Sequence, residues 1–361
     1  MGRPSRANAT IAARIVAWQR AQGRRGLPWL GQRDPYLVWL SEVMLQQTQV
    51  GTALAYYQRF IARYPDVAAL AVAALDDVLA LWSGLGYYSR ARNLHRCAQT
   101  VVAEHGGAFP RSSGELAQLP GIGRSTAAAI AAFCFDERAA ILDGNVKRVL
   151  ARHLGFDADL AGAAAQRELW AYAESLLPAA ADMASYTQGL MDLGATLCLP
   201  RQPRCEVCPL QRSCAARRSG RTDELPIKSR RARRGARSNA LLWLCHREDL
   251  LLVRRPERGV WAGLWSLPEF SDAAAAEGRA APWRGRGQLL PPIRHVLTHF
   301  DWHLQTLRWQ LPAATTPTTR ERIAAAFEHA RWVHATQALA MGLPAPVRQL
   351  LLGDGAATAA A

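Results

Sequence analysis

Apolar residues recur every three to four positions over roughly the first 215 residues, which predicts a body made of helices. The stretches with this period are residues 11–18, 36–45, 54–60, 75–82, 91–102, 116–119, 126–133, 146–154 and 188–197. Pro65, Pro110, Pro120 and Pro178 fall between these stretches, where residues that interrupt helices belong. The first part of the chain is therefore predicted to be all-α.

The period changes from residue 239 onward. Residues 240–245 and 250–253 are predicted to form two strands paired around a turn at 246–249. Residues 295–311 alternate like one long strand, and residues 320–329 and 347–352 have the helical period. One face of this predicted strand carries Val296, Thr298, Phe300, Trp302 and Leu304. This second part is predicted to be α+β.

Composition places the boundaries between these parts. Residues 217–237 are rich in arginine and poor in apolar residues, which is typical of a linker. The small-residue tail at 353–361 is predicted to be disordered. The chain is therefore expected to be multidomain, with a helical body at 1–216, a basic linker at 217–237, an α+β domain at 238–352 and a tail at 353–361.

Charge and hydropathy indicate the kind of partner. The 361 residues carry a net charge of +15 and a pI near 10.3, which favours a polyanion, because Lys and Arg release counterions when they bind phosphates. The sequence contains no run of 18 uncharged apolar residues, so no membrane span is predicted. Arg14 and Arg20 interrupt the apolar stretch near the N-terminus that a signal peptide would need. We expect a monomeric protein of the bacterial cytosol and nucleoid.

Four of the seven cysteines lie close together in the sequence. Six, two and five residues separate Cys198, Cys205, Cys208 and Cys214 in turn. Zinc and a [4Fe–4S] cluster both accept four cysteine ligands, and the wide first gap with a single close pair favours the cluster. The other three cysteines, Cys97, Cys134 and Cys245, lie in apolar segments and are expected in the core.

A glycine-rich turn precedes one predicted helix. Gly121 and Gly123 bracket a turn that leads through Ser125 into an Ala-rich run. Glycines let the backbone approach a ligand closely, and the free amides of a helix N-terminus suit a phosphate. Such a motif alone is also compatible with a simple turn between helices.

Two carboxyl groups stand in different surroundings. Glu42 lies within an apolar run, where burial would raise its pKa and keep it protonated as a general acid requires; the alternative is a narrow polar edge of the helix. Asp143 opens a helix beside turn residues and is expected to stay ionised, although it could be only an N-cap. Two carboxyl groups whose pKa values differ, one protonated and one ionised, are suited to breaking a glycosidic bond.

Together these motifs resemble a known family. The turn at Gly121–Gly123, Asp143 and the four cysteines resemble the helix-hairpin-helix DNA glycosylases of the endonuclease III superfamily. The stretches W-L-S-E-V-M-L-Q-Q-T-Q-V at 39–50 and G-L-G-Y-Y-S-R-A-R-N-L at 84–94 resemble adenine DNA glycosylases of the MutY type. The resemblance also covers G-V-W-A-G-L-W-S-L-P at 259–268, which is similar to a Nudix-type domain.

The resemblance implies roles for individual residues. Glu42 would protonate the adenine base, Asp143 would stabilise the sugar cation, and Asn145 would position the acid network. The adenine pocket would include Leu27, Trp29 and Gln188. The DNA contacts would come from Gln47 and Tyr87, which wedge into the duplex, and from Gly121, Gly123, Ser125 and Lys147. The cysteines would hold a [4Fe–4S] cluster.

Three departures narrow this expectation. Ser125 stands where strand-cleaving members carry a lysine, which favours a monofunctional glycosylase. The metal-binding glutamates of a Nudix hydrolase are missing after Pro268, so the C-terminal domain should recognise the lesion and not hydrolyse. The family's Phe-Ser-His triplet, which recognises 8-oxoguanine, corresponds to Leu297, Thr298 and His299. The expected partner is double-stranded DNA with adenine opposite 8-oxoguanine or guanine.

Two other functions remain to be weighed. An endonuclease III-like glycosylase and lyase for pyrimidine lesions is disfavoured by Ser125 and by the C-terminal domain. A non-catalytic Fe–S sensor of DNA is disfavoured because binding alone needs neither Glu42 nor Asp143.

Overall fold

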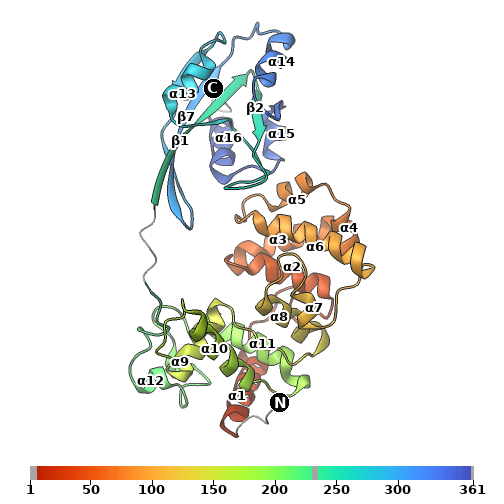
Figure 1. The fold of residues 1–361 in the computed structure, drawn as a ribbon, viewed down its shortest axis with the longest axis vertical. Helices are drawn as coiled ribbons and strands as arrows, with labels where there is room; N and C mark the ends of the chain where they lie inside the picture. Colours follow the sequence, from red (N-terminus) through yellow and green to blue (C-terminus); the bar gives the residue numbers. More distant parts are fainter. Residues whose placement is uncertain (1–5, 230–234, 359–361) are drawn as a thin grey trace. The chain divides into compact units, whose positions relative to one another are not determined.

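The computed structural model describes residues 6–229 and 235–358 and divides the chain into two compact units (Figure 1). The first unit combines Met1–Val72 with Asn93–Arg230, and the second combines Ala73–Arg92 with Arg231–Ala361. The segment Ala73–Arg92 therefore makes its contacts mainly with the C-terminal residues, although it is embedded in the helical part of the sequence.

The first unit is helical throughout its described residues. Its helices are α1 (Arg6–Gln22), α2 (Pro35–Leu45), α3 (Val50–Arg63), α4 (Val67–Ala71), most of α6 (Ser89–His105), α7 (Ser113–Leu116), α8 (Arg124–Phe135), α9 (Gly144–Leu154), α10 (Ala163–Ser175), α11 (Met183–Asp192) and α12 (Ala215–Arg218). Short 3-10 turns, η1 (Ala180–Asp182) and η3 (Cys205–Val207), and a π-helical turn, η2 (Leu193–Leu197), join them. The sequence did not predict α10.

The core of this unit forms around α8 and α11. The Ala-rich α8 buries the unbroken run of small and apolar residues 127–132, which lets neighbouring helices approach closely. A Cβ at Gly189 of α11 would lie 2.7 Å from the Ile15 side chain, so α1 and α11 touch where only glycine fits. These contacts hold together the helices that carry the candidate acids.

The second unit is built on a mixed sheet. Its strands are β1 (Gly235–His246), β2 (Asp249–Arg254), β3 (Trp265–Ser266), β4 (Glu269–Phe270), β5 (Arg286–Leu289), β6 (Ile293–Val296), β7 (Phe300–Gln310) and β8 (Ala330–His334). The order is β3-β2-β1-β7-β5, and β4, β6 and β8 pair with β1, β7 and β2 respectively. Within it, β1 runs parallel to β7 and antiparallel to β2.

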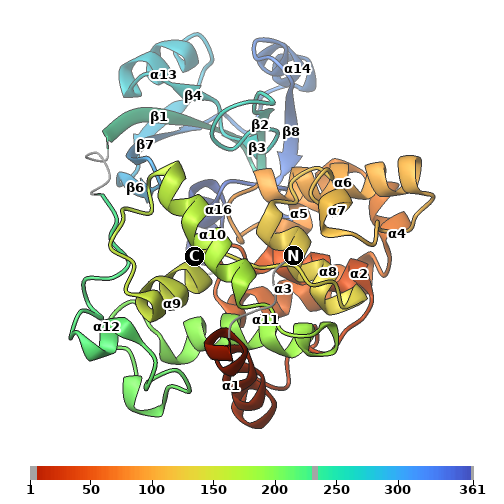
Figure 2. The ribbon, with the colours of Figure 1, turned by 60° about the horizontal axis from the view of Figure 1, so that its bottom comes forward.

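Helices cover both faces of this sheet. The helices of this unit are α5 (Leu75–Trp82), α13 (Ala273–Ala280), α14 (Pro317–Ala325), α15 (Ala335–Leu339) and α16 (Ala345–Thr358). Figure 2 shows α13 and α14 on one side of the sheet and α16 on the other. The α13 side is packed with Leu242, Leu244 and Leu307 among others. The fold is thus an all-α body with a C-terminal α+β domain, as predicted.

The hairpin prediction for β1 and β2 is confirmed, since Cys245 pairs with Leu250 and His246 with Asp249. The single strand predicted over 295–311 is wrong. Residues 293–296 form β6, which turns back through 297–299 into β7. The alternation of apolar and polar residues continues through the three-residue hairpin loop, so this pattern alone did not show that the chain reverses direction there.

The structure also differs in part from the predicted linker and the predicted tail. Leu225 is buried and its carbonyl accepts from Arg152 Nε at 2.9 Å, so residues up to 229 pack on the helical unit. Helix α16 continues to Thr358, into the tail that was predicted to be disordered. Residues 230–234 of the predicted linker and 359–361 of the predicted tail lie outside the described residues.

Every helix in the described part of the chain is too short or too polar to cross a lipid bilayer.

The turn before α8 gives a test of the fold. Gly121 has φ +77° and its Cβ would lie 2.6 Å from Asn93 Cβ, whereas Gly123 has φ −85° and open space. We expect Gly121→Ala to lower the free energy of unfolding by about 2 kcal/mol or more, from strain and overlap. The matched variant Gly123→Ala should cost at most about 1 kcal/mol, through a weaker N-cap. Equal losses in urea unfolding would contradict this assignment.

Candidate active site and cysteine loop

Glu42 projects from α2, a helix that is otherwise mostly buried. The helix begins with Asp34, whose carboxylate accepts from Tyr36 N at 2.8 Å, and with Pro35 in the first turn. Burial first, and then the nearby carboxylate of Asp143, raise the pKa of Glu42 to about 8 against the opposing effect of Arg24. Glu42 therefore keeps its proton at neutral pH.

Asp143 caps the N-terminus of α9. Its Oδ1 accepts from Asn145 N at 2.7 Å and from Val146 N at 2.8 Å, so the N-cap prediction holds geometrically. Ser125 Oγ accepts from Leu142 N at 3.0 Å, which ties the start of α8 to the residue before Asp143. The glycine turn and the acid, far apart in the sequence, are therefore held together.

Arg148 links Asn145 to the cysteine loop. Its Nη2 donates to Asn145 Oδ1 at 2.8 Å and to Gly194 O at 2.7 Å, and its Nε donates to Cys198 O at 2.7 Å. A Cβ at Gly194 would lie 2.6 Å from Asn145 Cβ, so this approach also requires glycine. The sequence analysis missed Arg148, although its place three residues after Asn145, about one helical turn, was a signal.

A buried ion pair lies beside the acids. Asp192 is fully buried and accepts from Arg24 Nε at 2.6 Å, from Arg24 N at 2.9 Å and from Gln188 Nε2 at 2.7 Å. Gln188, predicted to be a polar wall of a base pocket, is thus held in place by Asp192. Sequence reasoning missed Asp192, and its signal was a lone acid in the apolar run 190–194.

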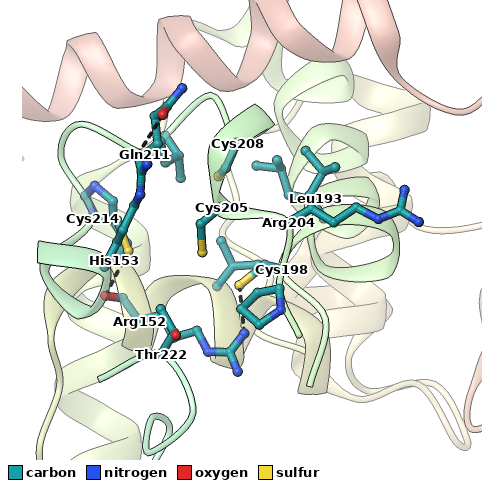
Figure 3. Close-up of a pocket in the computed structure, with 15 residues that line it drawn as sticks. Arg152, His153, Leu193, Cys198, Arg204, Cys205, Cys208, Gln211, Cys214 and Thr222 are labelled. Carbon is teal, nitrogen blue, oxygen red and sulfur yellow. Dashed lines mark hydrogen bonds between the residues drawn. The ribbon is translucent and has the colours of Figure 1, made fainter. Parts of the chain in front are cut away.

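The four clustered cysteines line one pocket. Figure 3 shows Cys198, Cys205, Cys208 and Cys214 gathered around a common space. The other residues that line it include the apolar Val149, Leu193, Leu197, Pro203 and Leu210, and all four thiols are free of disulfides. Burial raises the pKa of Cys208 to about 11, so that thiol would stay protonated unless a cation binds.

Arginine and histidine side chains surround this pocket. Arg152 Nη1 donates to Cys198 Sγ at 3.3 Å and to Leu199 O at 2.7 Å. His153 is buried, which lowers its pKa to about 4, and contacts Tyr172 OH and Ser213 Oγ at 2.7 and 3.0 Å. In the described residues no three His, Cys, Asp or Glu side chains form a site for a single metal ion.

The other predicted residues of the first unit are partly exposed. Trp29 packs edge-on against Tyr57 with the ring centres 5.2 Å apart, and Leu27 is half-buried nearby in the sequence. Lys147 Nζ donates to Gln166 Oε1 at 3.2 Å. Gln47 is exposed and has φ +60° at the end of α2, an uncommon conformation for a residue other than glycine.

Tyr87 and the predicted triplet at 297–299 lie in the second unit, whereas Gln47, predicted to act with Tyr87, lies in the first. Tyr87 is 48 % exposed with φ +49°, and its hydroxyl is 3.3 Å from Thr298 Oγ1. Both line one hollow with Leu297 and His299 of the hairpin loop. His295 and Trp261, whose rings are 5.5 Å apart, line it as well and were not predicted.

Comparison with known proteins identifies this arrangement. Residues 40–175 match the family model for the HhH-GPD superfamily base excision DNA repair protein, and residues 239–353 match that for the NUDIX domain. The chain is 33% identical to "Adenine DNA glycosylase" from Buchnera aphidicola subsp. Acyrthosiphon pisum over 93% of its own length and 95% of that protein. The chain belongs to the adenine DNA glycosylase family.

More distant relatives agree. The human "Adenine DNA glycosylase" is 32% identical, with 84% of this chain and 68% of the human protein covered. A solved thermostable thymine-DNA glycosylase has a TM-score of 0.53 and 28% identity over 59% of this chain and 97% of its own. This family member is a base-excision DNA glycosylase that binds DNA, with a helix-hairpin-helix body and a Nudix-like domain.

The raised pKa of Glu42 predicts how stability depends on pH. The folded state keeps this proton up to about pH 8, whereas the unfolded chain loses it near the ordinary value of 4.5. The stability of the parent relative to Glu42→Gln should therefore fall as pH rises between these values, by about 1.4 kcal/mol per pH unit. Urea unfolding from pH 5 to 8 measures it, with Glu104→Gln, an exposed site, as control. A difference independent of pH would contradict burial of Glu42.

Proposed function

We propose that this glycosylase removes adenine that lies opposite 8-oxoguanine or guanine, by hydrolysis of the N-glycosidic bond and without cleaving the strand. The observation that carries the proposal is the pair of carboxyl groups: Glu42 is protonated at neutral pH because it is buried close to Asp143. One acid and one carboxylate are what this bond cleavage needs.

The protonated Glu42 would donate to the leaving base, which lowers the barrier because neutral adenine leaves more easily than its anion. Positive charge then develops on the sugar. Asp143 is held toward this charge by the two backbone amides that it accepts from, and would stabilise it electrostatically. The base must first leave the helical stack to reach these groups.

Three sets of side chains would support these acids. Asn145, held by Arg148, would position the network of groups around the two acids. Trp29 and Leu27 would line the apolar side of the adenine pocket, and Gln188, fixed by Asp192, its polar side. The turn residues Gly121 and Gly123, with Lys147, would hold the DNA backbone.

Ser125 explains why the strand should stay intact. A lyase needs an amine that attacks the sugar and forms an imine, and a hydroxyl cannot do so. The Ser125 hydroxyl is moreover occupied by the amide of Leu142. We infer that the product is an abasic site.

The cysteine pocket fits a [4Fe–4S] cluster. Four cysteines face one space, yet the described residues form no site for a single metal ion, and a four-iron core holds its cysteines farther apart than one ion does. Cys198, Cys205, Cys208 and Cys214 would be the ligands. When bound, the cluster would order residues 198–214, whose arginines can meet phosphates.

The second unit would recognise the opposite base. Tyr87 has a strained, exposed position suited to a wedge, and Thr298 and His299 offer hydrogen-bonding groups at the hairpin tip beside it. Leu297 offers an apolar side chain where the family carries a ring. We propose that residues 1–216 carry the chemistry and residues 238–352 the recognition of the lesion.

A base-release assay tests the proposed activity. With duplexes carrying adenine opposite 8-oxoguanine, we expect free adenine and strand breaks only after alkali. Glu42→Gln should lower the single-turnover rate at least a hundredfold, with binding retained, because it cannot donate the proton. Glu104→Gln is the matched control. Cleavage of a thymine glycol duplex, or nicking without alkali, would instead favour a pyrimidine-lesion lyase.

Metal analysis tests the cluster. Anaerobically purified protein should be brown with about four irons per chain. Cys205→Ser should lose iron and DNA affinity, whereas Cys97→Ser, at a buried cysteine outside the pocket, should keep its iron. One zinc per chain would refute the assignment.

The ratio of excision rates opposite 8-oxoguanine and guanine tests lesion recognition. A hydrogen bond to the lesion contributes about 1–3 kcal/mol, so His299→Ala should reduce this ratio about tenfold and Thr298→Ala somewhat less. Val296→Ala, on the same hairpin but without a polar group, should leave it unchanged. If His299 only stabilises the fold, the melting temperature will fall while the ratio stays at the parent value.

A further inference from the structure

One end of the C-terminal sheet carries a hollow whose charged lining residues are all arginines. The hollow has a volume of about 980 Å³. Among the described residues it is lined by Arg247, Arg284, Arg286, Arg308, Gln288 and Gln310, with four smaller or apolar residues and no Asp or Glu. A volume of this size is large enough for a group as big as a nucleotide.

The register of the strands explains why these side chains converge. Arg286 of β5 lies opposite Gln310 of β7, and Gln288 lies opposite Arg308. Leu307 and Trp309 pack with α13, so the residues that alternate with them face the other side of the sheet. The arginines and glutamines of both strands therefore share that face.

Two glycines fix the direction of the arginines. A Cβ at Gly285 would lie 2.2 Å from Trp309 Nε1, and one at Gly287 would lie 3.0 Å from the same ring. The backbone at the start of β5 is thus pressed against Trp309, and Arg284 and Arg286 point away from it. The alternation of arginine and glycine at 284–287 is a requirement of this packing.

Two arginines of the hollow carry charge that no carboxylate of the described residues offsets. Arg284 and Arg286 are exposed, and among the described residues neither pairs with a carboxylate. Arg247 donates only to Ala313 O at 3.4 Å, and the Arg308 guanidinium lies 5.1 Å from the centre of the Trp243 ring. Several guanidinium groups around one hollow repel each other, so an anion that enters it is stabilised.

We propose that this arginine hollow binds phosphates of the DNA backbone, as a second contact separate from the one at the mispair. Guanidinium groups match phosphate oxygens in pairs. Arg284 and Arg286, two residues apart on extended chain, are spaced by about 6.7 Å, which is comparable to successive phosphates of one strand. The contact would add affinity for any duplex, whatever its sequence.

The hollow lies far from the hairpin tip that would recognise the lesion. The two sit at opposite ends of β7, whose 11 residues span about 35 Å. That length corresponds to about ten base pairs of duplex. The contact is therefore distinct from the opposite-base site and needs DNA that extends beyond the mispair.

Edge protection is the simpler explanation for part of this surface. Charged residues on an edge strand such as β5 prevent it from pairing with another sheet. That purpose accounts for Arg286. It does not account for Arg308 on the inner strand β7, nor for Arg247 at the turn between β1 and β2.

The salt dependence of binding to undamaged DNA tests the proposal. The full chain and Arg284→Gln/Arg286→Gln would be titrated against a labelled duplex of about 40 base pairs at salt concentrations of about 50 to 200 mM. We expect the slope of log K against log[salt] to shrink by about 1 to 2, since each lost phosphate contact removes about 0.9. Binding at about 0.1 M salt should weaken about tenfold.

A variant with the same charge change provides the control. Arg322→Gln/Arg331→Gln removes two exposed arginines from α14 and β8, outside the hollow, and should keep the parent slope. An unchanged slope for the hollow variant would overturn the proposal, and so would equal losses in both variants, which would reflect net charge alone. Thermal melting of both variants would show that they fold.

Two further measurements separate other outcomes. If the hollow variant loses binding to polyglutamate but not to DNA, the surface fits an acidic protein and the proposal fails. Single-turnover excision at saturating protein should stay within about twofold of the parent, because the hollow holds no group that reaches the base. Since the binding test uses undamaged duplex, its result does not depend on the proposed action on adenine, and failure of one proposal can be distinguished from failure of the other.

Discussion

Two carboxyl groups placed close together in a poorly solvated site cannot both be charged without a large cost, and the active site depends on this constraint. Glu42 lies on the mostly buried helix α2 and keeps its proton, with a pKa of about 8. Asp143 instead receives two backbone amides at the start of α9. Burial, which penalises the charged form of Glu42, is thus the main reason why Glu42 is the protonated group.

The surrounding contacts serve to hold that arrangement. Ser125 joins the glycine turn to the residue before Asp143, and Arg148 joins Asn145 to the cysteine loop. Glycine at 194 lets that loop approach α9 closely. A cofactor that orders the cysteine loop would therefore also restrain Asn145, so stability of the loop and placement of the acids are physically linked.

Charged side chains are arranged differently in the two units. In the helical unit, Asp192 and Arg24 form a buried pair beside Glu42, which fixes Gln188 without adding net charge. In the C-terminal unit, Arg284 and Arg286 reach one hollow, and no carboxylate of the described residues pairs with either. Balanced charges suit a site that must hold a neutral base and a protonated acid, whereas unbalanced positive charge suits phosphates.

The sequence by itself determined the helical body, the change to an α+β domain, the family, and the candidate acids and cysteines, because these depend on local period and on chemically distinctive residues. Tertiary structure alone decided the rest. Alternation did not distinguish a long strand from the hairpin at 297–299, since a short loop preserves the period. The roles of Arg148 and Asp192 and the convergence of Arg286 with Arg308 depend on contacts between segments distant in sequence, which no local pattern records.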